Sequence, residues 1–183
     1  MKNISTLILT LLSFTLSAQQ VGDFNLTNVL DGKSVALKDY AAKPGVIIIF
    51  TANSCPFDEY YAGRIKAIDK LPVILVNAHP DPTESSEAMI KRAHQLGYTT
   101  PYLADKDQTL MQALGASKST EAFLLKNTNG SFAVFYHGAI DDNPQVVQDV
   151  KHAYLNEAIN LMLSGQSMDK TQVRPTGCNI RKK

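Results

Sequence analysis

The sequence of 183 residues predicts an α/β fold, a three-layer sandwich in which helices flank a central mixed sheet. The apolar run at residues 46–50 is too short for a helix and is apolar on both faces, as in a central parallel strand. Segments with helical periodicity alternate with further short apolar runs. Two dipeptides, Asp31-Gly32 and Asn129-Gly130, are typical of β-hairpin turns. With 44% apolar and 19% charged residues, the chain suits one globular domain.

The first half of the chain predicts a hairpin followed by a strand-helix-strand unit. Residues 21–37 alternate apolar and polar side chains around the first Asp-Gly turn, which indicates a β-hairpin. The strand at 46–50 is followed by an apolar stripe with helical spacing at 56–70 and by a second apolar run at 73–76. A helix that connects two such strands predicts a right-handed βαβ unit.

The second half predicts three more helices, a short strand and a second hairpin. In chain order these are a helix over 83–97 with Thr83 as N-cap and Gly97 at its end, a strand near 102–104, a helix over 107–114, a hairpin over 122–136, and a long helix that begins after Asn143-Pro144 and ends at Gly165. This order favours a sandwich of the thioredoxin type, with an N-terminal β-hairpin and a C-terminal tail.

Residues 1–18 have the outline of a secretory signal peptide, with one lysine, an apolar run and small residues at the end. Cleavage after Ala18 divides the chain into this leader, a domain at 19–165 and a tail at 166–183 that carries Cys178. We therefore expect a periplasmic or secreted protein, in a compartment where disulfides persist.

The predicted mature chain has balanced charge. The leader takes Lys2, one of 18 basic residues, so 17 basic residues remain against 17 acidic ones. Such a chain has no overall electrostatic attraction to nucleic acid or to an anionic membrane. The basic residues of the tail are not interleaved with the aromatic side chains that a stacking surface needs. We expect neither nucleic-acid binding nor membrane association after the leader is removed.

Cys55 is the leading candidate for a catalytic residue. It follows the strand at 46–50, and ligands of α/β sheets bind at the carboxyl ends of strands. It also precedes Pro56, which suits the first position of a helix. As an N-cap, its sulfur would face the free amides of the first turn, which stabilise a thiolate, whereas the carboxylates of Asp58 and Glu59 act against it. We expect this sulfur to be open to small oxidants.

Asp58 stands where a C-x-x-C motif has its second cysteine, so Cys55 has no partner nearby in the sequence. Cys178 is the only other cysteine after the predicted cleavage site. Two interpretations remain open. In the first, Cys55 is the nucleophile and Cys178 the resolving cysteine that closes an intramolecular disulfide. In the second, the pair forms a permanent bond that holds the tail of a non-catalytic, thioredoxin-like binding module.

Four segments resemble a known family across nearly the whole predicted mature chain. They are SCPFDEYYAGRI, STEAFLLKNTNGSFAVFYHGAIDDNP, YLNEAINLMLSGQ and RPTGCNIR. The chain is similar to the peroxiredoxin-like redoxins of the alkyl hydroperoxide reductase and thiol-specific antioxidant family. This resemblance implies a thioredoxin fold and a thiol-dependent peroxidase or thiol-disulfide oxidoreductase, with a peroxide or protein disulfide as substrate and a thiol as electron donor. It matches Cys55 to the active-site cysteine and Cys178 to the tail cysteine.

The chain departs from its relatives at two positions. Thioredoxins and many relatives have a proline before the strand predicted at 122, where this chain has Thr120. Such a proline, when cis, shapes the substrate groove. Typical peroxiredoxins have Thr or Ser three residues before the cysteine to bind the peroxide, where this chain has Ala52. A neighbouring polar side chain at 51, 53 or 54 would have to take over that role.

No other group of residues predicts a cofactor or a metal site. The four histidines are scattered, and none pairs at metal-ligand spacing. Asp141 and Asp142 lack the glycine and distal glutamate of a calcium loop, so we assign Asn143 to helix capping. Arg64 is expected to serve packing or the surface rather than the thiolate. The sequence lacks motifs for nucleotide binding and for serine hydrolysis.

Overall fold

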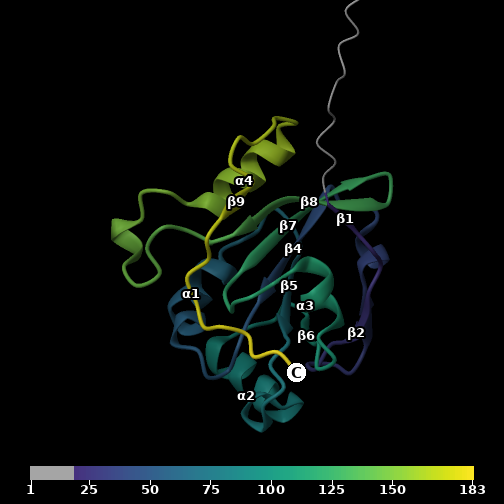
Figure 1. Ribbon diagram of the computed structural model, residues 1–183, viewed down its shortest axis with the longest axis vertical. Coiled ribbons are helices and arrows are strands. Elements are labelled where there is room, and N and C mark those ends of the chain that lie inside the picture. The colour runs from purple at the N-terminus through teal and green to yellow at the C-terminus, as the bar shows by residue number, and fades with distance from the viewer. Residues whose placement is uncertain (1–18) are drawn as a thin grey trace, which may run out of the picture.

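A computed structural model describes residues 19–183, so the predicted leader at 1–18 lies outside the described residues. These residues form an α/β sandwich in which a central mixed sheet lies between two layers, as the sequence predicts (Figure 1). Within this part of the chain, no helix has the length and apolar character needed to cross a membrane.

The central sheet is mixed and has seven strands. They are β1 (Gln20–Val21), β4 (Gly45–Phe50), β5 (Val73–Asn77), β6 (Tyr102–Ala104), β7 (Ala122–Thr128), β8 (Ser131–Gly138) and β9 (Gln172–Val173). Their order is β1-β8-β7-β4-β5-β6, and β9 pairs in parallel with β8. Strands β4, β5 and β6 are parallel to one another, whereas β7 is antiparallel to both β4 and β8.

Both predicted hairpins are confirmed. The N-terminal hairpin pairs β2 (Asn25–Thr27) with β3 (Ser34–Ala36) as a separate two-stranded sheet. The second hairpin pairs β7 with β8, and its turn residues Asn129 and Gly130 have φ angles of 54° and 87°. Asn and Gly tolerate this left-handed region, which the turn between two twisted strands requires.

Helices cover both faces of the sheet. They are α1 (Pro56–Lys66), α2 (Ser86–Leu96), α3 (Thr109–Leu114) and α4 (Tyr154–Leu163). Side chains of α1, α2 and α4 pack on one face, where they meet Ile47 and Ile49 of β4. Helix α3 and the N-terminal hairpin pack on the other face, against Ile48 and Phe50. Because alternate residues of a strand face opposite sides, β4 is buried along its whole length, as its continuous apolar sequence predicts.

Helices α1 and α2 each differ from the prediction at one end, and α3 begins at Thr109 rather than at residue 107. Helix α1 ends at Lys66 rather than at residue 70. Pro72 restricts the residue before it to an extended conformation, so the connection to β5 has to leave the helix earlier. The N-cap of α2 is Ser85 and not Thr83, and its Oγ accepts a hydrogen bond of 3.3 Å from the Ala88 N–H. The predicted end of this helix at Gly97 is confirmed.

The last helix starts about ten residues later than predicted, at Tyr154. The backbone carbonyls of Asn143 and Pro144 accept hydrogen bonds from Arg64, so this stretch is held in a loop. Val147 begins only a short 3-10 turn and is 52% exposed, in contrast to its predicted place in a buried stripe. The Asn143 side chain does accept bonds from two following backbone N–H groups, but no helix continues from that turn.

Replacing Arg64 with alanine is expected to lower the free energy of unfolding by about 2 kcal/mol, because a buried carboxylate loses its charged partner. Arg64 forms an ion pair with Asp141, whose side chain is only 4% exposed, and its guanidinium lies 4.2 Å from the Tyr61 ring centroid. Urea unfolding measures the change. The control is Lys38→Ala, which removes an exposed pair and should cost less than about 0.5 kcal/mol. Equal effects of the two variants would contradict this prediction.

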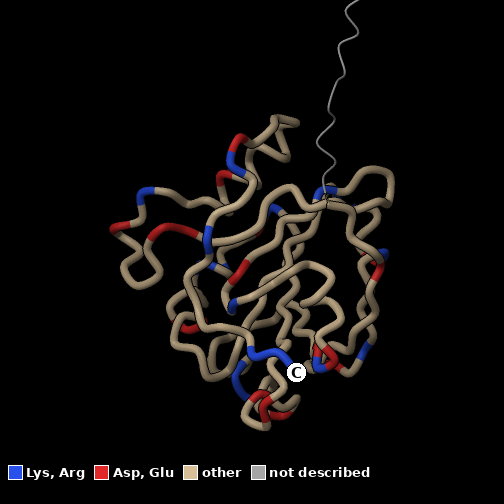
Figure 2. Tube along the Cα trace, in the orientation of Figure 1, with Lys and Arg blue, Asp and Glu red and all other residues tan. Residues whose placement is uncertain are grey.

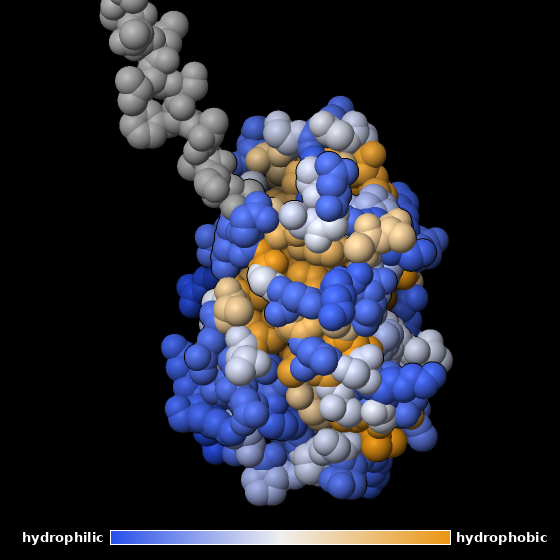
Figure 3. Space-filling view, turned by 90° about the vertical axis from the view of Figure 1, so that its right-hand side faces the viewer, coloured by the Kyte–Doolittle hydropathy of each residue, from blue (hydrophilic) through white to orange (hydrophobic). Residues whose placement is uncertain are grey.

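Charged residues of both signs are distributed along the chain trace (Figure 2). The basic C-terminus is paired within the chain, since Arg181 contacts Asp81 and Lys183 contacts Asp107. Figure 3 shows a band of apolar surface that hydrophilic side chains interrupt.

Candidate functional site

Cys55 lies where the sequence predicts, just beyond the end of β4 and at the N-cap of α1. Its backbone is extended, with φ −91° and ψ 121°, and Pro56 occupies the first helical position. The residue is 2% exposed, so the expectation of an open sulfur is wrong for the oxidised state. Its side chain also accepts no hydrogen bond from the amides of the first turn, because the sulfur is bonded to Cys178.

A disulfide joins Cys55 to Cys178, 123 residues further along the chain. The two Cα atoms are 5.9 Å apart. Cys178 is half-buried, so it is the more accessible residue of the pair. The structure therefore brings together the two residues that the sequence singles out, and it holds them in the oxidised form.

The C-terminal tail is positioned by backbone pairing as well as by the disulfide. It runs from α4 past α1, and the C-terminal Lys183 contacts Asp107, just before α3 (Figure 1). The Ser119 N–H donates to the Cys178 carbonyl at 2.9 Å, and the Ile180 N–H donates to the Ser117 carbonyl at 2.8 Å. A Cβ atom at Gly177 would collide with the Ser119 carbonyl, so only glycine fits before this cysteine. Ile180 is buried in the core on the α3 side.

Glu84 holds the loop that leads into Cys55. Its carboxylate accepts hydrogen bonds from the backbone N–H groups of Asn53 and Ser54, the Ser54 hydroxyl and the Asn77 amide, at 2.6–3.0 Å. The side chain is almost fully buried, and burial by itself would raise its pKa. The donated bonds outweigh that effect and lower the pKa, so Glu84 is ionised at neutral pH. The sequence gives no signal for this role, because the bonded loop lies 30 residues away.

Asp58 lies in the first turn of α1, three residues after Cys55, and is 1% exposed. Neither of its carboxyl oxygens has a hydrogen-bond partner of normal geometry within residues 19–183. Burial raises its pKa well above the usual value, more than the nearby Ala52 amide and Ser119 hydroxyl lower it. The sequence predicts that the Asp58 carboxylate opposes the thiolate. In the structure, burial keeps this carboxyl group protonated to a higher pH than an exposed one.

The Asp58→Asn variant is expected to gain stability over the wild type as the pH rises. The folded protein keeps the Asp58 proton to a higher pH than the unfolded chain. Wild-type stability therefore falls as the pH rises from the unfolded pKa through the raised folded pKa, and an amide has no such dependence. Urea unfolding at pH values from 4 to 8 measures the difference. Asp69→Asn, the same change at an exposed residue after α1, is the control, and a pH-independent difference for Asp58→Asn would contradict the prediction.

The polar side chains next to Ala52 are already engaged. The Thr51 hydroxyl donates to the Tyr102 hydroxyl at 2.9 Å, the Asn53 amide donates to the Thr83 carbonyl at 3.1 Å, and Ser54 binds Glu84. Each of these three groups therefore already has a partner among the described residues, which it would have to leave or share in order to bind a peroxide.

Thr120 occupies the position where relatives have proline, and its hydroxyl donates to the Thr176 carbonyl of the tail at 3.0 Å. No peptide bond within residues 19–183 is cis. The segment from Ser117 to Thr120 therefore binds the chain's own tail. Glu121 stabilises this segment, because its carboxylate accepts hydrogen bonds from the backbone N–H groups of Ser117 and Lys118.

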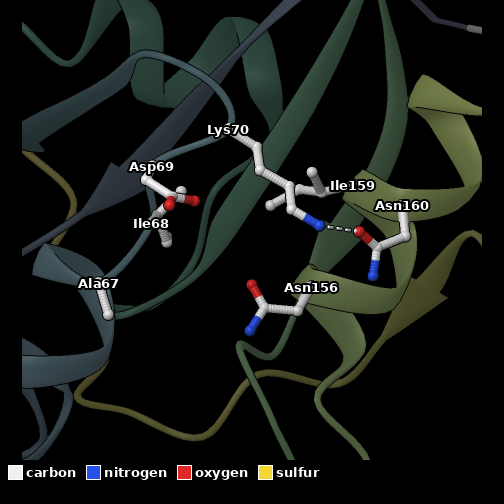
Figure 4. Close-up of a pocket in the computed structure, with 7 residues that line it drawn as sticks. All are labelled: Ala67, Ile68, Asp69, Lys70, Asn156, Ile159 and Asn160. Carbon is white, nitrogen blue, oxygen red and sulfur yellow. Dashed lines mark hydrogen bonds between the residues drawn. The ribbon is translucent and has the colours of Figure 1, made fainter.

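A surface pocket of about 210 Å³ lies away from the disulfide, between the end of α1 and α4 (Figure 4). Lys70 crosses it to donate a hydrogen bond of 2.6 Å to the Asn160 side chain. Its lining mixes polar and apolar side chains, and it contains no cysteine or histidine. The described residues contain no group of three His, Cys, Asp or Glu side chains that could hold a metal ion.

Comparisons with known proteins agree with this geometry. The sequence profile of the AhpC/TSA family matches residues 18–142. A conserved protein from Geobacillus kaustophilus is 28% identical, covers 91% of this chain and 92% of its own, and superposes with a TM-score of 0.80. A hypothetical protein from Sinorhizobium meliloti 1021 is 30% identical, covers 92% and 94%, and has a TM-score of 0.77. No curated protein sequence matches the chain.

The fold is also that of a secreted disulfide oxidoreductase from Mycobacterium tuberculosis. That chain is 13% identical, the alignment covers 75% of this chain and 94% of that one, and the TM-score is 0.55. At this identity the likeness is one of fold alone.

Proposed function

Because the chain belongs to the AhpC/TSA family, we propose that it is an exported, thiol-dependent redox protein in which Cys55 and Cys178 alternate between a dithiol and a disulfide. One observation carries this proposal: the cysteine at the start of α1 is bonded to the tail cysteine. A disulfide at a helix N-terminus suits reversible exchange, because the helix end stabilises the Cys55 thiolate that forms when the bond opens. The disulfide supports export, because disulfides persist in oxidising compartments.

In the proposed cycle, Cys55 is the nucleophile and Cys178 resolves the product. The Cys55 thiolate attacks one sulfur of a disulfide substrate, and the other substrate sulfur leaves as a thiolate. Cys178 then attacks the Cys55 sulfur, which releases the second substrate sulfur and closes the Cys55–Cys178 bond. Two electrons pass from the protein to the substrate. A thiol donor returns them by opening the bond again.

A disulfide substrate is favoured over a peroxide by the side chains around Cys55. Peroxide reduction would convert Cys55 to a sulfenic acid, which the Cys178 thiol would condense with loss of water. That reaction is helped by a hydroxyl that holds the peroxide, and the polar side chains of Thr51, Asn53 and Ser54 are bonded elsewhere. Family membership keeps the peroxidase as the second candidate.

The decisive experiment measures the potential of the disulfide and the pH at which Cys55 ionises. For a redox protein we expect the bond to equilibrate with glutathione or dithiothreitol buffers at a potential above about −270 mV, and Cys55 to ionise below about pH 8. A bond that stays closed below about −300 mV, with Cys55 ionising at pH 8.5 or higher, would instead identify the non-catalytic module with a structural disulfide.

A further inference from the structure

Three buried polar atoms beside the disulfide have no hydrogen-bond partner. These atoms are the two carboxyl oxygens of Asp58 and the hydroxyl oxygen of Ser119. None of them has a partner of normal geometry within residues 19–183. Asp58 is 1% exposed and Ser119 is fully buried. Unpaired buried polar groups are rare in folded proteins, because each costs free energy, and they are often explained by chemistry that uses them. Glu84, which is equally buried a short distance away, has four hydrogen bonds.

Each of the two residues lies next to one cysteine of the disulfide. Asp58 is three residues after Cys55, so both share one face of the first turn of α1, and side chains of a helix tilt towards its N-terminus. Ser119 donates its backbone N–H to the carbonyl of Cys178. The Ser119 hydroxyl and the Ala52 amide are near enough to Asp58 to affect its ionisation. The carboxyl group is thus enclosed between the loop that leads to Cys55 and the segment that binds Cys178.

We propose that Asp58 is the proton-exchange partner of the disulfide: it protonates the Cys55 sulfur when the bond opens and takes the proton back when the bond forms. This inference rests on the proposed redox function and adds a residue to it. A carboxyl whose burial outweighs the hydrogen-bond donors near it holds its proton at a pH where ordinary carboxylates have lost theirs. Asp58 can therefore supply a proton to Cys55, which is almost fully buried and has little contact with solvent.

The proposed step balances as follows. A donor thiolate attacks the half-buried Cys178 sulfur, and the bond to Cys55 breaks with its electron pair on the Cys55 sulfur. Asp58 gives its proton to that sulfur and becomes a carboxylate. A second donor thiolate attacks the mixed disulfide, the oxidised donor leaves, and Cys178 takes a proton from water. In the oxidising direction Asp58 removes the Cys55 proton as the thiolate attacks.

The groups that face Asp58 come from several elements. Glu84 lies on the turn before α2, and its negative charge favours the protonated form. Arg92 of α2 acts in the opposite direction but is engaged with Glu59, which lies on the exposed side of α1. Tyr98, before β6, and Tyr102, on β6, have raised pKa values, chiefly through burial, and are uncharged near neutral pH. Of the two carboxyl groups in this cluster, Asp58 has the raised pKa and Glu84 the lowered one.

The test is the rate at which dithiothreitol reduces the disulfide of the folded protein, measured by acid quench and by counting alkylated cysteines. The rate is divided by the thiolate fraction of dithiothreitol at each pH. For the wild type this corrected rate should fall as the pH rises through the Asp58 ionisation and should show a solvent deuterium isotope effect. Asp58→Asn should lose both features and react about 10- to 100-fold more slowly at the acid end.

Asp69→Asn is the matched control, since it makes the same change at an exposed carboxylate that follows α1. It should keep the wild-type profile and isotope effect. A wild-type profile in Asp58→Asn, or an equal change in both variants, would overturn the proposal while leaving the redox function in place. A wild-type bond that dithiothreitol opens only after denaturation would overturn both. If Asp58→Asn does not fold, the wild-type isotope effect decides: its presence supports the proposal and its absence overturns it.

Discussion

The Cys55→Ser variant should lose thiol-dependent turnover completely, because a serine hydroxyl neither ionises near neutral pH nor forms a disulfide. We expect this loss with small disulfide substrates and with peroxides, whichever the protein uses. The Cys178→Ser variant should still react once and should stop with the substrate attached to Cys55, or with Cys55 as a sulfenic acid. Substrate consumption in the presence of dithiothreitol measures turnover, and the mass of the quenched protein identifies the trapped species.

Both single variants lack the disulfide, so the matched comparison is between them and not with the oxidised wild type. Equal loss of the first reaction in Cys55→Ser and Cys178→Ser would contradict the assignment of roles. Full turnover in Cys55→Ser would contradict the assignment of the site itself. Circular dichroism of both variants shows whether the sheet and helices are retained.

Reduction of the disulfide should lower the free energy of unfolding by about 4 kcal/mol. The bond closes a loop of 123 residues, and the loss of chain entropy in the unfolded state grows slowly with the size of the loop. Urea unfolding with and without a phosphine reductant measures the difference. A Cys55→Ser, Cys178→Ser double variant should not respond to the reductant. An unchanged wild-type midpoint after complete reduction would contradict this prediction.

The parts of the fold that follow from local patterns are predicted well. The continuous apolar run of β4 places this strand in the centre of the sheet, and the Asn129-Gly130 pair marks the turn of the second hairpin. Cys55 and Pro56 together predict the start of α1 to the residue. These features depend on the backbone preferences of a few neighbouring residues, which the sequence states directly.

Features that depend on distant partners are not predicted. The start of α4 is delayed because Arg64 binds backbone carbonyls about 80 residues away. Glu84 is recognisable as part of the site only once the Cys55 loop is placed against it. Asp58 is visible in the sequence, but its burial, and therefore the neutral form that the structure favours, comes from packing between α1 and the segment around Ser119.

The pairing of the tail with Ser117, Ser119 and Thr120 has a consequence for molecular recognition. Any outside peptide that uses the same backbone groups competes with a segment tethered to the same molecule, whose effective concentration is on the order of millimolar. While the disulfide is closed, the tail is attached both through the chain and through Cys178, so weak ligands cannot displace it. Reduction of the disulfide removes one of the two attachment points of the tail. The redox state of the protein therefore determines which ligands can displace the tail from this segment.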